Sequence, residues 1–225
     1  PDEGTTFFGV WGASGDALWA VGQTDGGQGP PALWRRIDGT WAPWEDPDLG
    51  PGDDRTVYFK MAGVAADDAW IVGNRGLSLH WDGERLTQVP TDTDVETANT
   101  PLLTVDVGSG RPLAVGGAGN GLILEHDGTA WRDVSPDFVP SYNGVCSGGG
   151  QAWAVGQGGT RAHLQGGTWT ADTLDEAPET FKDWHACAID AEGGLWTVGG
   201  RIASRPLIEG VVGYQGPGRP GDVAL

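Results

Sequence analysis

The chain has 225 residues, long enough to bury a substantial core. Its 40 glycines and 15 prolines argue against long helices, because Gly costs about 1 kcal/mol and Pro about 3 kcal/mol in a helix interior. Its 12 tryptophans and 38% apolar residues argue against disorder. The net charge of -18 argues against binding to nucleic acid or to an anionic membrane surface, and no apolar run reaches the roughly 18 residues of a membrane span.

A motif of the form Trp-x-Val-Gly recurs along the chain. Aligned on its valine, the motif occurs at Val21, Val72, Val115, Val155 and Val198. The spacings are 51, 43, 40 and 43 residues, and the residue two before the valine is Trp in four of the five copies. Residues two apart in a strand point to the same face, so we expect this Trp and Val to pack into a neighbouring repeat. Five anchors at this spacing predict a repeat architecture of five units.

Each anchor has similar neighbours. A β-prone segment precedes it, in chain order at residues 7–11, 60–65, 102–106, 142–146 and 184–188. A polar turn separates this segment from the anchor strand, and a further strand with an Asp-Gly or Gly-Gly turn follows in most copies, as at 82–83 and 127–128. Four antiparallel strands in about 40 to 45 residues form a propeller blade. The sequence therefore predicts an all-β fold, a five-bladed β-propeller of four-stranded antiparallel blades, as a single domain over residues 1–225.

The last repeat leaves open how the fifth blade is completed. In one arrangement Glu209-Gly210 takes the place of the Asp-Gly turn, and residues 211–215 form a fourth strand from the same repeat. In the other, residues 204–216 form one strand and the N-terminal residues 1–7 supply the closing strand. The sequence favours neither.

The repeat units, written D-x-W-A-V-G followed by DG-x-x-W, resemble the secreted β-propeller repeats of Gram-negative bacteria, including myxobacterial surface proteins. They are more distantly similar to Asp-box and photosystem-assembly-factor-like propellers. The resemblance implies the fold and leaves the function open. Two departures are visible: Asp127 and Gly128 are adjacent where an Asp-box spaces them by one residue, and the Trp81-Asp82 pair lacks the Gly-His partner of a WD40 repeat.

The chain begins at Pro1 rather than Met, which a removed leader or a cloned segment would explain. Two cysteines permit one disulfide without proving a compartment. Together with the resemblance to secreted repeats, this leads us to expect a protein that is secreted, periplasmic or surface-anchored.

We call the first strand of each blade, which lies nearest the propeller axis, its inner strand. The loops that lead into the inner strands should share one propeller face with the loops between the second and third strands. They are longer than the turns at the other end, and long loops are where function concentrates. Polar residues follow the Val-Gly pair at Gln23, Asn74 and Gln157. Tyr142 and Trp184 begin inner strands on the same face. Amides and aromatic planes together can hold a glycan, a peptide or a protein; the alternative is that the amides cap strand ends and the aromatic rings fill the core.

A second candidate site uses soft ligands. Aligning the inner strands places Cys146 at the position of Cys187 in the neighbouring blade, and His185 lies two residues before Cys187. Cys, His and Cys near the propeller axis would suit copper as Cu(I), or zinc, with Met61 or His163 as further ligands. The alternatives are a disulfide between the two cysteines and two buried thiols that fill space.

Catalysis has little support, because no nucleophile elbow, zinc-protease, P-loop or Rossmann motif is present. We therefore expect an exported, non-catalytic ligand-binding propeller that is monomeric and takes a glycan, peptide or protein ligand on its loop-rich face. The rival hypothesis is a metalloprotein with copper or zinc at Cys146, His185 and Cys187, which would be a metalloenzyme if the metal kept an open position.

Overall fold

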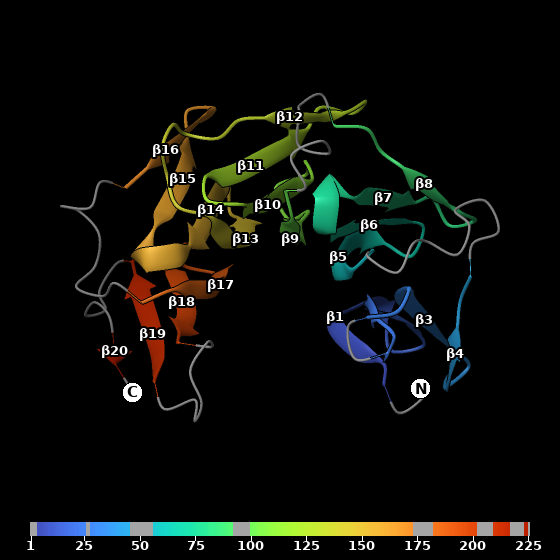
Figure 1. Ribbon diagram of the computed structural model, residues 1–225. Helices are drawn as coiled ribbons and strands as arrows, with labels where there is room; N and C mark the ends of the chain where they lie inside the picture. The colour runs from blue at the N-terminus through green and yellow to red at the C-terminus, as the bar shows by residue number, and fades with distance from the viewer. Residues whose placement is uncertain are drawn as a thin grey trace. The chain divides into compact units, whose positions relative to one another are not determined.

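The computed structural model describes residues 4–25, 28–45, 56–91, 100–172, 182–201, 209–216 and 223–224. These residues form five four-stranded sheets, in each of which the strands follow one another in chain order (Figure 1). Neighbouring strands pair antiparallel, as in β1 with β2 and β17 with β18. The predicted all-β fold, with five blades of four strands each, is confirmed.

The strands of each sheet come from one repeat. The first sheet contains β1 (Thr6–Ser14), β2 (Ala17–Gln23), β3 (Pro31–Ile37) and β4 (Thr40–Pro43). The second contains β5 (Tyr58–Ala65), β6 (Asp68–Gly73), β7 (Ser78–Trp81) and β8 (Leu86–Gln88). The third contains β9 (Leu102–Asp106), β10 (Leu113–Gly117), β11 (Gly121–His126) and β12 (Trp131–Asp133). The fourth contains β13 (Tyr142–Gly148), β14 (Gln151–Gly156), β15 (Arg161–Gln165) and β16 (Thr168–Ala171).

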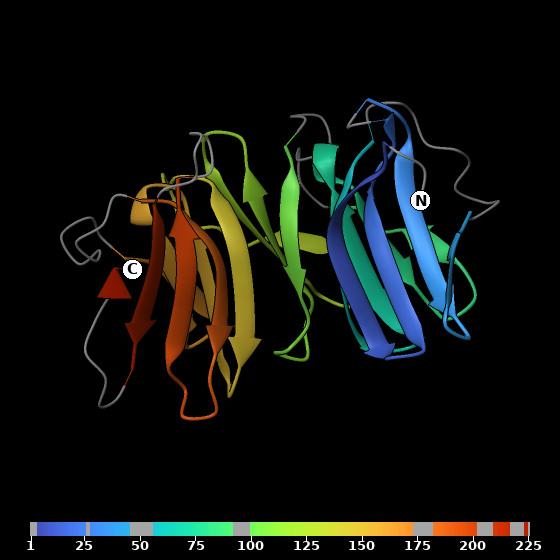
Figure 2. The same cartoon turned by 90° about the horizontal axis from the view of Figure 1, so that it is seen from below.

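The fifth sheet contains β17 (Trp184–Ile189), β18 (Leu195–Gly200), β19 (Gly210–Gln215) and β20 (Val223–Ala224) (Figure 2). Residues 211–215, one candidate for a fourth strand, therefore form most of the third strand, and the fourth strand comes from further along the same repeat. Residues 6 and 7, expected in one arrangement to close the last blade, belong to β1 and pair with β2 in the first sheet.

The chain divides into two compact units. The first comprises residues 1–107 and 126–132, and the second comprises residues 108–125 and 133–225. The first and second sheets lie in the first unit, the fourth and fifth sheets lie in the second, and the strands of the third sheet are shared out between them. The single-domain organisation stays a prediction. In the part of the chain that the structure describes, no helix has the length and apolarity to cross a membrane.

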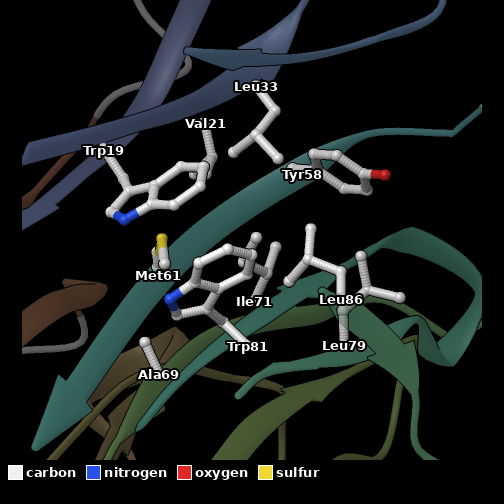
Figure 3. Packing of buried hydrophobic residues seen from close by; sticks show 10 residues of the cluster. All are labelled: Trp19, Val21, Leu33, Tyr58, Met61, Ala69, Ile71, Leu79, Trp81 and Leu86. Carbon is white, nitrogen blue, oxygen red and sulfur yellow. The ribbon is translucent and has the colours of Figure 1, made fainter. Parts of the chain in front are cut away.

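The recurring Trp and Val residues form the layers between sheets. In the first unit, Trp19 and Val21 of β2 pack against Tyr58 and Met61 of β5 and against Trp81 of β7 (Figure 3). The Trp19 and Trp81 rings meet edge to face with centroids 5.1 Å apart. We call the side of a sheet that carries the Trp-x-Val pair its back face and the opposite side its front face. In this cluster the back face of the first sheet packs against the front face of the second. The predicted packing of the anchors into a neighbouring repeat is thus observed between the first and second sheets.

The glycine after the anchor valine is required by a close backbone approach. At Gly22, Gly73, Gly156 and Gly199, a Cβ atom would overlap a backbone carbonyl oxygen at the start of the inner strand, belonging to Thr6, Val57, Ser141 and Asp183 respectively. The backbone of Gly156 is extended, with φ of -164°, so its conformation suits any residue and only the space is restricted. The repeated Val-Gly pair is therefore a packing requirement of the blade.

We expect Gly156→Ala to lower the free energy of unfolding by about 1 to 3 kcal/mol, because the new methyl group must displace the Ser141 carbonyl. Gly210→Ala is the matched control, since a Cβ atom there would have no heavy atom within 4 Å. Urea unfolding of the two variants measures the difference. Equal stability of both variants would show that the inner strand moves aside without cost.

The Asp-Gly turns between the third and fourth strands work through the aspartate side chain. Asp127 Oδ1 accepts hydrogen bonds from the backbone N–H groups of Thr129 and Ala130 and from the Thr129 hydroxyl. These bonds, led by that of the hydroxyl, lower the pKa of Asp127 to about 2. Asp82 accepts from two backbone N–H groups in the same way. The predicted hairpin turns at these positions are confirmed.

The inner strands carry a β-bulge near their start. The register of β13 against β14 shifts between Tyr142 and Gly144, and that of β17 against β18 shifts between Trp184 and Ala186. The same shift occurs in β1 and β5. A bulge inserts one residue and breaks the strict alternation of faces, and this decides where the cysteines point.

Candidate functional site

The two cysteines form a disulfide in the second unit. Cys146 pairs across its sheet with Trp153, whereas Cys187 pairs with Thr197. In the repeat, Trp153 corresponds to Trp196, one residue before Thr197, so the two cysteines are offset by one position rather than aligned. Successive residues point to opposite faces of a strand. Cys146 therefore lies on the back face of the fourth sheet and Cys187 on the front face of the fifth, and the two are bonded, with Cα atoms 5.7 Å apart.

This arrangement does not assemble the expected metal ligands Cys146, His185 and Cys187. Both sulfurs are held in the disulfide, so neither is a thiolate. His185 occupies the bulge of β17, and its Nε2 lies 2.9 Å from the Gly200 carbonyl oxygen. No group of three or more His, Cys, Asp or Glu side chains suited to a metal occurs among the described residues. Of the three sequence alternatives, the structure contains the disulfide.

Met61 belongs to the first unit, and both cysteines belong to the second. Its side chain is 1% exposed, and Figure 3 shows its sulfur between Trp19 and Trp81. Met61 is therefore a core residue on the front face of β5.

The predicted polar residues differ in what they do. Gln23 is 4% exposed, and its Nε2 donates to the Gly29 carbonyl within its own loop. Asn74 accepts a hydrogen bond from the Val57 N–H through Oδ1. Both amides brace loops. The Gln157 side chain is exposed, which leaves it as the member of this set best placed to meet a ligand.

The predicted aromatic residues lie in the core. Tyr142 packs in the cluster that joins the third-sheet strands β10 and β11 to the fourth sheet, and Trp184 packs with Val155 between the fourth and fifth sheets. Each side chain is 0% exposed. Burial, together with the nearby Asp172 carboxylate, raises the pKa of the Tyr142 hydroxyl well above its usual value.

In the second unit, a run of hydrogen bonds joins the loops at one end of the sheets. Two of these bonds end on the loop before β13. The Gly119 N–H donates to Ser141 Oγ, and the Gly121 N–H donates to the Val139 carbonyl. The Ser141 carbonyl also accepts from the Gln157 N–H, and Gly158 donates to Asp183 Oδ1. We call residues 118–121, 137–141 and 157–159 the loop surface. Backbone pairing of this kind gives the loops a fixed scaffold.

Phe138 stands out from this surface. Its side chain is 95% exposed, the highest value among the exposed large hydrophobic residues of the described chain. Its backbone φ is +55°, a left-handed conformation that is uncommon for a bulky side chain. Sequence reasoning missed Phe138. A signal was present, because an aromatic residue between Pro136 and Pro140 in a loop belongs to neither a strand nor a repeat position.

Arg161, the first residue of β15, is buried in an ion pair. Its Nε lies 3.0 Å from Asp172 Oδ2, and the two side chains are 10% and 15% exposed. The Asp172 N–H donates to the Arg161 carbonyl, as the Val134 N–H donates to that of Ile123 in the third sheet. Arg161 and Asp172 therefore occupy the positions that Ile123 and Val134 hold in the third sheet, where the pair is apolar.

Comparison with known proteins identifies propellers. No protein-family model matches the chain, and no curated protein matches it in sequence. The solved structure of YCF48 bound to D1 peptide is similar, with a TM-score of 0.66 and 18% identity, over 98% of this chain and 68% of that one. YCF48 from Cyanidioschyzon merolae gives a TM-score of 0.64 and 18% identity, over 98% and 70%. The extracellular domain of BT4673 from B. thetaiotaomicron gives 0.61 and 10%, over 86% and 26%. At these identities the likeness concerns the fold, which is that of a β-propeller.

Proposed function

We propose that the chain is an exported, non-catalytic binding module that takes a peptide segment of a protein on the loop surface of the second unit. Phe138 carries this proposal. A phenylalanine that is 95% exposed is an apolar anchor without a partner, and its loop is fixed by backbone bonds to both neighbouring loops. The exposed Gln157 and Asn120 amides supply polar groups on the same surface.

A peptide is favoured over a glycan by the form of the surface. Sugars are held by aromatic planes and amides that converge on a pocket, but the predicted aromatic residues Tyr142 and Trp184 are buried. A single protruding ring suits an apolar contact with side chains of a partner protein. The neighbour YCF48, which has been solved bound to D1 peptide, is a propeller with a peptide ligand, and this supports the same ligand class here.

Export is favoured by the disulfide, because disulfides persist mainly in oxidising compartments. The neighbour BT4673 is an extracellular domain, which supports the same location. The non-catalytic role is proposed from the sequence, which has no nucleophile-elbow, zinc-protease, P-loop or Rossmann motif.

The test is selection of binders from a displayed library of random peptides, followed by titration of a selected peptide against Phe138→Ala. Loss of an anchor ring that is buried on binding should weaken affinity by about 10- to 100-fold, corresponding to about 1.5 to 3 kcal/mol. Val64→Ser is the matched control, because Val64 is also exposed, at 62%, but lies in the first unit near the end of β5.

Unchanged binding in Phe138→Ala, or an equal loss in Val64→Ser, would contradict this placement of the site. A parallel glycan array separates the ligand classes. Glycan binding that depends on Phe138, with no peptide selected, would contradict the peptide assignment while keeping the surface.

A further inference from the structure

The loop surface carries a negative charge beside its apolar anchor. Asp137 immediately precedes Phe138, and both side chains are exposed. Asp183 borders the same surface, because its Oδ1 accepts a hydrogen bond of 2.8 Å from the Gly158 N–H. The three segments of the loop surface contain no Lys, Arg or His. The Phe138 ring therefore has a carboxylate next to it and no positive charge within the loop surface.

The positive charges of the second unit are engaged elsewhere. Three basic side chains of this unit are paired with carboxylates: Arg111 with Glu125, Arg161 with Asp172, and Lys182 with Glu209. Among the described residues, none forms an ion pair with Asp137. Its charge is therefore not neutralised by a neighbouring side chain of the described chain.

The charge of the whole chain acts in the same direction. Its net charge is -18, and a field of one sign attracts segments of opposite charge and repels segments of like charge. A cationic segment would therefore be drawn to this protein over longer distances, and an acidic one would be disfavoured.

A lysine or arginine side chain matches both features of the Phe138 position. Its apolar stem can cover an exposed aromatic ring while its charged head stays in water. The head is also attracted by the negative face of the ring and by a carboxylate nearby. One side chain can thus use the Phe138 ring and the Asp137 carboxylate together.

We propose that the loop surface selects a basic peptide segment, in which a Lys or Arg side chain lies across the Phe138 ring and reaches the Asp137 carboxylate. This inference rests on the peptide-binding function proposed above and names the class of peptide. An acidic or uncharged segment of the same apolar content lacks the ion pair and is bound more weakly.

The first test is the composition of peptides selected from a displayed random library. Lys and Arg should be enriched over the unselected library. One selected peptide and a copy with its Lys and Arg residues replaced by Gln then serve as probes. Affinity for the selected peptide should fall between about 0.05 M and about 0.5 M salt, and affinity for the Gln copy should stay nearly constant.

The second test locates the charge contact with a double-mutant cycle. Asp137→Asn should weaken binding of the selected peptide about two- to fivefold, the range of an exposed ion pair. The same substitution should leave binding of the Gln copy unchanged, because the partner charge is already absent. Asp137 is exposed and its replacement has nearly the same shape, so the fold should be retained.

Glu192→Gln is the matched control, because it removes the same charge from an exposed side chain of the second unit. Glu192 lies in the turn between β17 and β18. This turn is at the opposite end of the sheets from the loop surface, where Gln151 donates to the Gly193 carbonyl. The control should bind the selected peptide within about 1.5-fold of the wild type.

The outcomes separate this inference from the function on which it rests. Phe138-dependent binding without enrichment of Lys and Arg, or without an effect of Asp137→Asn, would overturn the inference and leave peptide binding standing. Equal weakening by Glu192→Gln and Asp137→Asn would assign the effect to net charge and overturn the contact at Asp137. Failure to select any peptide, or selected peptides that bind Phe138→Ala as tightly as the wild type, would contradict the proposed function and this inference with it.

Discussion

Replacement of both cysteines, in Cys146→Ala/Cys187→Ala, is expected to lower the free energy of unfolding by about 4 kcal/mol. The disulfide spans a sequence separation of 41 residues, so it removes a large closed-loop entropy from the unfolded chain. In the folded protein it joins the inner strands of the fourth and fifth sheets, next to the buried Trp153 and Leu195. The bond therefore limits the unfolded chain and holds two blades together.

Urea unfolding with and without a strong reductant measures this effect. The wild type should lose the same stability on reduction as the double variant loses by substitution, and reductant should leave the double variant unchanged. A loss below about 1 kcal/mol in both experiments would contradict a stabilising bond between the blades.

Asp172→Val is expected to cost about 3 to 5 kcal/mol of unfolding free energy, because it leaves the Arg161 guanidinium buried without its carboxylate. Both side chains are largely buried, at 10% and 15% exposed, so water compensates little. Asp172 Oδ1 also lies 3.9 Å from the His163 ring nitrogen Nδ1. The expected loss of unfolding free energy comes from the buried, unpaired charge of Arg161 rather than from a lost surface contact.

The double variant Arg161→Ile/Asp172→Val restores the apolar pair that the third sheet has at Ile123 and Val134. It should regain most of the stability lost in Asp172→Val, since well-packed apolar residues replace a buried ion pair at little or no cost. Thermal or urea unfolding of the three proteins forms the comparison. A double variant no more stable than Asp172→Val would show that the site has lost its packing for another reason.

Most of the fold could be predicted from the sequence repeat. Trp19 and Val21 are two apart in a strand, and the same spacing at Trp153 and Val155 placed the second strand of each sheet. The Asp-Gly turns were readable because the Asp127 side chain binds the backbone that follows it. These features are local, so the sequence alone was enough to predict them.

The candidate site depended on register, which the sequence does not display. Bulges at the start of the inner strands shift which residues share a face, and an offset of one position turned an expected metal pair, Cys146 and Cys187, into facing partners of a disulfide. Gln23 resembles Gln157 in the sequence, but only Gln23 has a loop carbonyl, that of Gly29, within reach of its amide. Phe138 belongs to no repeat position, so alignment of the repeats passed over it.

Amide hydrogen exchange of the protein with a selected peptide bound locates the ligand without substitutions. Exchange should slow only on the loop surface, residues 118–121, 137–141 and 157–159, and should stay unchanged in the turns at 148–151 and 165–168. Protection centred on those turns or in the first unit, with none at residues 137–141, would contradict peptide binding at the loop surface.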